Sequence, residues 1–564
     1  MTVRVAAVQL AATEDVEENL AAAVRLVSDA VARGAELVVL PEFGNHVSWY
    51  TDRAHARRMA ETLDGPFVTT LAELAARHGI HLMVNCTLAR ADGRTTGTNV
   101  LIGPDGGVLA TSDKQVLMGS ERDHLDPATA PSPVVETPLG RIGLYSCMDG
   151  VIYETPRMLA VDGAQILLNS VNSFALDEAS LHVPVRAVEN GVWVVAANKV
   201  GPLVPDHSIH AVAAGVGVPV DMLHGAGESQ IVAPDGTVVA IAPRAGEAVV
   251  VADIDVALAD AKARPDGTDP MAGRRPELYR PIVEAPRGRT APAGAAALTA
   301  AVVCPGPGDD ALAGLRSAVA GGARLVVLPE LAAWSDGRVP AAGGAGAFGL
   351  ADVVEALDGT DAVAVWSERD GGTHLGLAAD ASGVVLRQPQ LHASARHEDW
   401  VCELGDSVTV VDVPWGRLAV VVGDDALYPE TFRLAALADA DVVAVPFTTT
   451  AARDLDLMLL ERAAENRLNL AVASRPGPHG AGMLVGLSSD FTLWASWANP
   501  FAGVISRPDP VLARAPVTSA VLRPACATNR MVTRGTDVVD GRPWDLAAVL
   551  VRPHAAAGPS RAGA

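Results

Sequence analysis

The chain has 564 residues, 49% of them hydrophobic and 19% charged, and its formal net charge at pH 7 is −23. These values are typical of a folded globular protein that is too long for a single ordinary core, so about two to four domains are expected. The acidic balance disfavours nucleic acid or an anionic membrane as a partner, because either would require a basic surface.

The sequence lacks the signatures of membrane, secreted and metal-binding proteins. No run of about 18 uncharged apolar residues occurs, and the first ten residues, MTVRVAAVQL, lack the long apolar region of a signal peptide. We therefore expect a cytoplasmic protein. The five cysteines include no CxxC pair, which predicts neither a disulfide framework nor a thiolate zinc site. We expect no metal and no cofactor.

Strand-like and helix-like patterns alternate along the first half of the chain. Helices are predicted where apolar residues recur at helical spacing, at residues 14–33, 64–78, from about 153, and at 178–190. Strands are predicted for the apolar runs at 3–10, 36–40, 81–89, 142–145, 165–169, 192–198 and 248–254. Hairpins with Pro-Asp-Gly turns are predicted at 99–114 and 229–242. This alternation predicts an α/β fold, a mixed sheet with helices packed on it.

Residues 140–154, GRIGLYSCMDGVIYE, join a predicted strand to a predicted helix through a turn that contains Cys147. Such a turn exposes a nucleophile at the end of a sheet, and N–H groups at the following helix start can face a developing negative charge. A catalytic cysteine is one interpretation. The alternative is that Cys147 is a small buried residue that packs at a strand end, as free cysteines commonly do.

The sequence contains an internal repeat. RGAELVVLPE (33–42) returns as GGARLVVLPE (321–330), and LGRIGLYSCMDGVIYETPR (139–157) returns as WGRLAVVVGDDALYPETFR (415–433). VRAVENGVWVVAAN (185–198) returns as ERAAENRLNLAVAS (461–474), and the last two pairs share an offset of 276 residues (139 to 415, 185 to 461). The pattern predicts two homologous domains in tandem.

Domain boundaries follow from this repeat and from composition. Residues 285–297 are rich in Pro, Ala and Gly and are predicted to form a linker. The linker separates a first domain at 1–284 from a second domain at 298–555. Residues 556–564 are predicted to be a flexible tail.

The landmarks of the first repeat follow one another as LPE at 40–42, Lys114, CMD at 147–149 and RAVEN at 186–190. This order resembles the carbon–nitrogen hydrolase (nitrilase) superfamily, in which a glutamate, a lysine and a cysteine lie at strand ends. The resemblance covers the whole first domain. It implies two nitrilase-like α-β-β-α sandwich domains in tandem, the first intact and the second degenerate.

The resemblance also implies a role for each site residue. Cys147 would be the nucleophile that forms a thioester, Glu42 the general base, and Lys114 the group that holds the oxyanion together with the backbone N–H of Met148. Desolvation is expected to raise the pKa of Glu42, and the neighbouring ammonium to lower that of the thiol. Glu121 resembles the family's second glutamate, although the histidine-leucine pair usual before it is missing. Glu42 as a surface residue and Lys114 as a solvated hairpin end are the structural alternatives.

Other charged residues in these motifs are assigned structural roles. Asp149 and Glu154 are expected to fix the turn and the helix start. Arg186 and Glu189 are expected to form a structural pair near the floor of the site.

Only three of the 43 basic residues are lysines. Lys199 and Lys262 belong to no motif and are expected to be surface charges, as most lysines are.

Hydrolysis of a small carboxamide to a carboxylate and ammonia is the leading functional prediction, because Asp149-Gly150 after Met148 resembles the amidase branches of the superfamily more than the true nitrilases. A nitrilase, an N-carbamoyl-amine hydrolase or an amide-forming acyltransferase would use the same three residues. A ligand-binding scaffold is the alternative outside enzymes. Loop residues are the candidates for substrate contacts, namely Trp49, Tyr50, Asn172, Ser173 and Phe174.

The second repeat keeps the glutamate, as Glu330, but not the rest of the predicted site. Gly423 stands at the nucleophile position and Gln390 at the lysine position, and Glu398 is predicted to be the counterpart of Glu121. We therefore expect a structural or regulatory second domain. Members of the family commonly pair through the faces of their sandwiches, so the fused copies are expected to pair within one chain. A further homo-oligomer is a possibility that the sequence leaves open.

Overall fold

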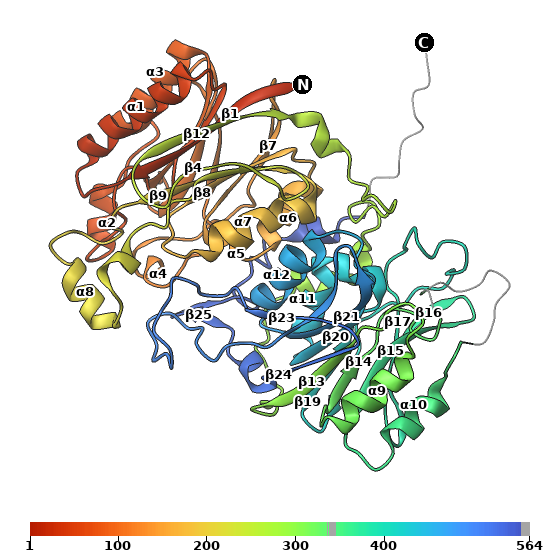
Figure 1. Ribbon diagram of the computed structural model, residues 1–564. Coiled ribbons are helices and arrows are strands. Elements are labelled where there is room, and N and C mark those ends of the chain that lie inside the picture. Colours follow the sequence, from red (N-terminus) through yellow and green to blue (C-terminus); the bar gives the residue numbers. More distant parts are fainter. Residues whose placement is uncertain (335–336, 338–345, 554–564) are drawn as a thin grey trace, which may run out of the picture.

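The computed structural model describes residues 1–334, 337 and 346–553 (Figure 1). The predicted tail at 556–564 lies outside the described residues. In the first half, twelve strands form one continuous sheet that folds into two layers, joined where the end of β1 pairs with the end of β9 at Leu10↔Lys199 and Ala11↔Val200.

The two layers of the first half contain six strands each. In spatial order, the first layer is β5 (Val108–Asp113), β4 (Thr95–Ile102), β3 (His81–Ala89), β2 (Leu37–Val39), β1 (Thr2–Ala11) and β12 (Ala248–Asp255). The second layer is β6 (Val134–Thr137), β7 (Gly140–Ser146), β8 (Ile166–Val171), β9 (Trp193–Val200), β10 (Gln230–Val232) and β11 (Val238–Ile241).

Apolar side chains cover both faces of the inner strands. Leu37 and Val39 of β2 pack with Ile142 and Leu144 of β7 between the layers. Val38, which points to the opposite face, packs beneath the outer helices. Burial on both faces explains why these strands have nearly continuous apolar sequences.

Helices cover the outer face of each layer, which gives an α-β-β-α sandwich. On the first layer lie α1 (Val16–Ala32) and α3 (Pro66–His78), and on the second lie α6 (Glu154–Val161) and α7 (Val183–Asn190). The side chain of Asp15 accepts hydrogen bonds from two N–H groups of the first turn of α1 and so fixes where that helix begins. The helix predicted at 178–190 starts with a π-helical turn, η1 (Glu178–His182), which continues into α7. Shorter helices are α2 (Arg53–Met59), α4 (Glu121–His124), α5 (Met148–Val151) and α8 (Ile209–Val216).

The second half has the same layering, built as two six-stranded sheets. One is β17 (Gly383–Pro389), β16 (Thr373–Asp380), β15 (Val363–Asp370), β14 (Leu325–Val327), β13 (Leu298–Val303) and β24 (Val517–Leu522). The other is β18 (Val410–Val413), β19 (Gly416–Val420), β20 (Val442–Pro446), β21 (Asn469–Gly477), β22 (Gly480–Val485) and β23 (Pro510–Leu512). The helices are α9 (Ala311–Ala320), α10 (Leu350–Leu357), α11 (Pro429–Leu437) and α12 (Leu459–Asn466), the last preceded by the π-helical turn η7 (Asp454–Met458).

The two halves meet through their helices, with α6 and α7 facing α11 and α12 at the centre of Figure 1. Apolar residues of both halves form one buried cluster there, in which Leu181 and Val185 pack with Leu455 and Leu459. The contact therefore has the character of a protein core rather than of a loose linkage.

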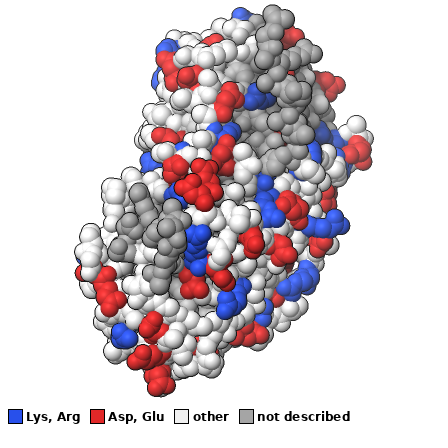
Figure 2. Space-filling model, turned by 90° about the vertical axis from the view of Figure 1, so that its right-hand side faces the viewer, with Lys and Arg blue, Asp and Glu red and all other residues white. Residues whose placement is uncertain are grey.

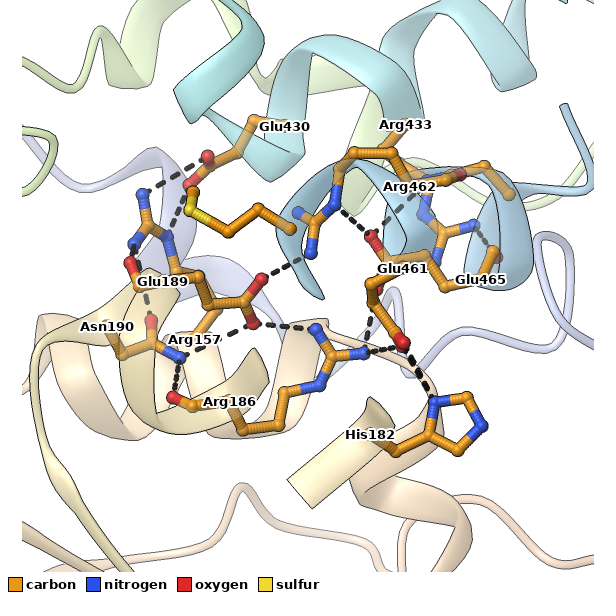
Figure 3. A network of polar contacts seen from close by, with 12 residues as sticks. Arg157, His182, Arg186, Glu189, Asn190, Glu430, Arg433, Glu461, Arg462 and Glu465 are labelled. Carbon is orange, nitrogen blue, oxygen red and sulfur yellow. Dashed lines mark hydrogen bonds and ion pairs between the residues drawn. The ribbon is translucent and has the colours of Figure 1, made fainter. Parts of the chain in front are cut away.

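Buried ion pairs cross this contact, and Figure 3 shows those of Arg157, Arg186 and Arg462. The crossing pairs are Arg157–Glu430, Arg433–Glu154, Arg186–Glu461, Arg186–Glu465 and Arg462–Glu189. Most of them come in exchanged sets: Arg157 of the first half binds Glu430 of the second, and Arg433 of the second binds Glu154 of the first. Such an exchange of equivalent partners is the signature of a two-fold contact between like surfaces.

The C-terminal segment of each half extends over the other half. Tyr279 of the first half shares a hydrogen bond of 2.7 Å with His392 Nε2 of the second. In the other direction, Thr536 Oγ1, in the hairpin of β25 (Met531–Thr533) and β26 (Thr536–Asp537), accepts from Gly119 N and donates to Leu117 O. Residues 285–297 form no helix or strand and lie along the second half.

The surface is mixed in charge on the face that Figure 2 shows, where acidic and basic side chains are interspersed. Among the described residues, no helix has both the length and the apolar character needed to cross a membrane.

Candidate active site

Cys147 lies in a strained turn directly after β7. Its φ is +45°, a value that residues other than glycine rarely adopt and that costs on the order of 1–3 kcal/mol. Its backbone N–H donates to Ser170 O at 2.9 Å and to Asn169 Oδ1 at 3.0 Å, both on β8. Helix α5 begins at the next residue, Met148, so the turn places the cysteine between a strand end and a helix start.

Three further charged residues lie near this turn. Glu42 comes after β2, Lys114 directly after β5, and Glu121 begins α4. Lys114 Nζ lies 2.9 Å from Glu42 Oε1 and 2.8 Å from Glu121 Oε1, and the side chains of Lys114 and Glu42 are completely buried. Glu42 and Lys114 are therefore neither a surface carboxylate nor a solvated hairpin end.

The buried ions shift one another's protonation. Burial raises the pKa of Glu42 to about 8, and the Lys114 ammonium only partly offsets this effect. Burial would lower the pKa of Lys114, but the carboxylates of Glu121 and Glu42 hold it well above its ordinary value. Glu42 Oε2 has no hydrogen-bond partner among the residues that the structure describes. Glu42, which can accept a proton, thus lies beside the Lys114 ammonium, which stays charged.

The Cys147 thiol differs from the expectation that a neighbouring ammonium lowers its pKa. Lys114 acts in that direction, but burial and the nearby Glu42 carboxylate outweigh it and raise the pKa well above its ordinary value. The resting cysteine is therefore a neutral thiol. It becomes a nucleophile only when a base removes its proton, and Glu42 is the carboxylate that acts most strongly on its pKa.

Asp149 ties the cysteine turn to the lysine loop. Its carboxylate accepts from the backbone N–H of Val116 at 2.8 Å, Gln115 at 3.1 Å and Ser146 at 3.4 Å. The three bonds hold the residues next to Lys114 against the turn that carries Cys147, so the expected structural role of Asp149 is confirmed.

A cavity of about 50 Å³ opens beside Cys147. Of the predicted substrate contacts, Asn172, Ser173 and Phe174 line it, as does Met148. The cavity also has lining residues that sequence reasoning missed, namely Asp177, Glu178 and His182 from the first half and Ile505, Ser506 and Val532 from the second. No motif marks those from the second half, because only the packing of the two halves brings them to Cys147.

Trp49 and Tyr50 are not among the residues that line this cavity. Tyr50 is buried, shares a hydrogen bond of 2.6 Å with Thr87 Oγ1 and stacks on His46. Trp49 is partly exposed at the surface. Phe174 instead contacts second-half aromatic rings, with 5.5 Å between its ring centroid and that of Trp494.

Three structural expectations need correction. Lys199 is not a surface charge: it is buried, donates to His46 O at 3.0 Å, and burial lowers its pKa to about 7. Lys262 is half-buried and donates to the carbonyl groups of Asn190, the last residue of α7, and of Gly191 after it. Glu154 does not merely start a helix, because it is fully buried and pairs with Arg433 of the second half at 2.8 Å. The Arg186–Glu189 pair is present at 2.6 Å.

The corresponding pocket of the second half is occupied by its own side chains. Gly423 has a φ of +52°, close to that of Cys147, and a Cβ built on it would lie 2.3 Å from Glu330 Oε1. Arg396 donates to both oxygens of Glu330, at 2.8 and 3.1 Å. Glu398, the predicted counterpart of Glu121, is exposed, and the 276-residue offset places His397 there instead (121 to 397). That prediction was wrong.

Glu330, His374 and His397 form the one group of potential metal ligands found among the described residues, with candidate ligand atoms within 4.8 Å of one another. Both nitrogens of His374 already have partners, Gln390 Oε1 at 2.6 Å and Ser367 Oγ at 2.9 Å. Arg396 neutralises the carboxylate. The donors are thus satisfied by protein groups.

Comparison with known proteins concerns the first half. The carbon–nitrogen hydrolase family model matches residues 4–264. The omega-amidase NIT2 of Danio rerio is 30% identical over 292 residues, which cover 49% of this chain and 96% of that protein. The nitrilase of Pyrococcus abyssi is 28% identical over 265 residues (47% and 93%), and the N-carbamoylputrescine amidase of Solanum tuberosum is 26% identical over 302 residues (50% and 95%).

Solved structures resemble the same part of the chain. An amidase from Nesterenkonia sp. is 24% identical with a TM-score of 0.40, and the match covers 49% of this chain and 95% of that one. The C. elegans NitFhit protein is 25% identical with a TM-score of 0.42, and the match covers 49% and 66%.

Proposed function

The chain belongs to the carbon–nitrogen hydrolase family, which makes it an enzyme acting on carbon–nitrogen bonds other than peptide bonds, and we propose that its first half hydrolyses a small carboxamide to a carboxylate and ammonia. The observation that carries the proposal is the buried Glu42–Lys114–Glu121 cluster beside Cys147, whose thiol needs a base and whose turn faces a cavity.

The first chemical step forms a thioester. Glu42 takes the proton of the Cys147 thiol, and the sulfur attacks the carbonyl carbon of the amide. Negative charge then develops on the carbonyl oxygen, where Lys114 Nζ and the backbone N–H of Met148 stabilise it. Loss of one such donor typically costs about 100- to 1,000-fold in rate. Glu42 returns the proton to the leaving nitrogen, which departs as ammonia and leaves the acyl group on sulfur.

The second step hydrolyses the thioester. Glu42, again ionised, removes a proton from a water molecule that attacks the acyl carbon, and the tetrahedral intermediate is stabilised by the same two donors. Collapse releases the carboxylate product and returns the proton to sulfur. Glu121 acts by position: it accepts from Lys114 at 2.8 Å and from the Met118 N–H at 2.8 Å, and so holds the ammonium toward the site.

We further propose that the chain arose by tandem duplication and that its second half is a non-catalytic copy. The matching strand orders support this proposal, and so does a shared device: Asp425 accepts from the N–H groups of Leu391 and His392, as Asp149 does from Gln115 and Val116. The second copy lacks a side chain at Gly423 and an ammonium at Gln390, so it can form neither the thioester nor the oxyanion contact.

The second half would then serve as the structural partner of the first, in an intramolecular pair. Its segments at 505–506 and 532 complete the wall of the Cys147 cavity, and the exchanged ion pairs hold the two helix faces together. Fusion keeps the two surfaces at a high effective concentration.

Ammonia release from a panel of small amides, N-carbamoyl amines and nitriles tests the catalytic proposal. We expect release by the wild type and loss of at least about 1,000-fold in Cys147→Ala. Cys402→Ala is the matched control, because Cys402 is the exposed cysteine of the described residues and belongs to the second half. Equal rates in Cys147→Ala and the wild type would refute the assignment of the nucleophile.

A further inference from the structure

The Cys147 cavity contains a carboxylate without a partner. Glu178 lines the cavity and is only 7% exposed. Among the described residues, its carboxylate makes no hydrogen bond and no ion pair, and Oε2 is fully buried. A buried carboxylate without a partner is costly, so such a group points to a ligand that is absent from the protein alone.

The nearest cation is already committed elsewhere. His182 also lines the cavity, but its Nδ1 lies 2.9 Å from Glu461 Oε2, and its Nε2 lies 2.9 Å from Ser506 Oγ and 3.6 Å from Asp177 Oδ2. Figure 3 shows the ring turned toward Glu461 across the contact between the halves. Lys114 is bound between two other carboxylates. Among the described residues, neither cation forms an ion pair with Glu178.

Asp177, the residue before Glu178, also lines the cavity and has one carboxylate oxygen without a donor. Asp177 is 1% exposed, and its Oδ2 accepts from the backbone N–H groups of Ile505, Ser506 and Arg507. Its Oδ1 is buried and has no partner among the described residues. Asp177 and Glu178 together form what we call the acidic corner of the cavity.

We propose that the Cys147 cavity accepts a short amide whose far end carries a protonated amine, and that the acidic corner binds this ammonium group. The inference rests on the proposed attack by Cys147 on a carboxamide. An ammonium supplies three donors and one positive charge, which matches two orphan acceptors on carboxylates. An amide whose far end carries a carboxylate would instead be repelled.

Two other features fit this ligand. The cavity volume of about 50 Å³ corresponds to the space of a few water molecules, which restricts the ligand to a short chain. Burial raises the pKa of Glu178 to about 7, and a bound cation favours its ionised form. The backbone of residues 505–507 fixes Asp177, so the second half helps to determine which substrate the first half accepts.

Three amides of matched length test the preference: β-alaninamide (cationic), butyramide (neutral) and succinamate (anionic). We expect kcat/KM for β-alaninamide to exceed that for butyramide by at least about 10-fold, the range of a hydrogen bond to a charged group, and succinamate to be the poorest. Glu178→Gln should lower the β-alaninamide to butyramide ratio by at least about 10-fold. Glu73→Gln, an exposed charge-matched control on α3, should not change the ratio.

A second measurement does not depend on turnover. Methanethiosulfonates with aminoethyl, propyl and sulfonatoethyl groups modify thiols, and peptide mass spectrometry gives the rate at Cys147 for each. Relative to their rates with 2-mercaptoethanol, the cationic reagent should react with Cys147 at least about 10-fold faster than the neutral one. Glu178→Gln should remove this advantage, and the exposed Cys402 should not show it.

The outcomes separate the inference from the proposed function. Hydrolysis of butyramide or succinamate in preference to β-alaninamide would overturn the inference and leave the hydrolase proposal intact. If none of the amides released ammonia, the hydrolase proposal would fail for this class, and the three thiosulfonate rates would still decide the inference. Equal cationic and neutral rates at Cys147 would refute the acidic corner as a cation site.

Discussion

Replacing the equivalent glutamates of the two halves, as Glu42→Gln and Glu330→Gln, separates catalysis from stability within one molecule. Both side chains are buried at equivalent positions, Glu42 after β2 and Glu330 after β14, and glutamine has nearly the same shape as glutamate. Glu42 has Oε2 free for a proton, whereas both oxygens of Glu330 accept from Arg396. The same substitution should therefore have opposite consequences in the two halves.

The structure gives the expected size of each effect. Loss of a general base typically lowers the rate by about 100- to 10,000-fold. Because Glu42 serves both steps, we expect the loss of kcat in Glu42→Gln to lie near the larger end of this range. Its folding cost should be small, because Lys114 keeps Glu121 and burial opposes the charge that is removed. Glu330→Gln breaks a buried pair, which costs about 3–5 kcal/mol; Arg396 keeps Asp424, so we expect about 3 kcal/mol.

The assays are steady-state ammonia release and equilibrium urea unfolding followed by circular dichroism. Glu42→Gln should lose turnover at nearly unchanged stability, and Glu330→Gln should lose stability while kcat of the folded protein stays within about threefold of wild type. A loss of kcat above about 10-fold in a fully folded Glu330→Gln would refute the assignment of the second half as non-catalytic. Retention of most activity in Glu42→Gln would refute the general base.

Further predictions concern pH and the contact between the halves. Glu42 acts as a base only when ionised, and burial raises its pKa to about 8, so kcat/KM should rise with pH through about 8 rather than near 4.5; a rate that is flat from pH 6 to 9 would contradict this. Arg186→Met removes the cation that pairs with three buried carboxylates and should lower the free energy of unfolding by about 3–5 kcal/mol in the urea assay. The exposed Arg33→Met, which breaks a pair with Asp29, should cost about 0–1 kcal/mol, and similar losses in both variants would argue against a structural role for the buried network.

Much of the fold follows from local patterns. The strand predicted at 81–89 is β3, and the helix predicted at 14–33 is α1 within two residues at either end. Both predictions succeed because burial leaves a pattern in the sequence: a continuous apolar run in the strand and apolar residues at helical spacing in the helix. The helix at 178–190 was predicted as one element, but it begins as a π-helical turn. Nothing in the apolar periodicity distinguishes that turn from an ordinary helix start.

Glu42 and Cys147 could be chosen from the sequence because each follows a buried strand in a short motif, and Lys114 because it ends a predicted hairpin. Glu42 and Lys114 both leave the first layer at the same edge, because the strands before them, β2 and β5, run in the same direction, and their side chains meet there at 2.9 Å. The thiol's raised pKa could not be predicted, because it depends on the balance between burial, Glu42 and Lys114. Lys199 shows the same limit: its burial is set by packing around His46 and not by neighbours in the sequence.

The sequence by itself therefore determined the family resemblance, the repeat, the three residues proposed for catalysis and the absence of the cysteine and the lysine from the second copy, because each of these depends on residue identity at fixed spacing. Only the tertiary structure decided what surrounds them. Ser506 reaches the Cys147 cavity, and His182 binds Glu461, through contacts between residues more than 270 positions apart. Long-range packing sets which buried groups lack a partner, and the unpartnered Glu178 is what points to the substrate.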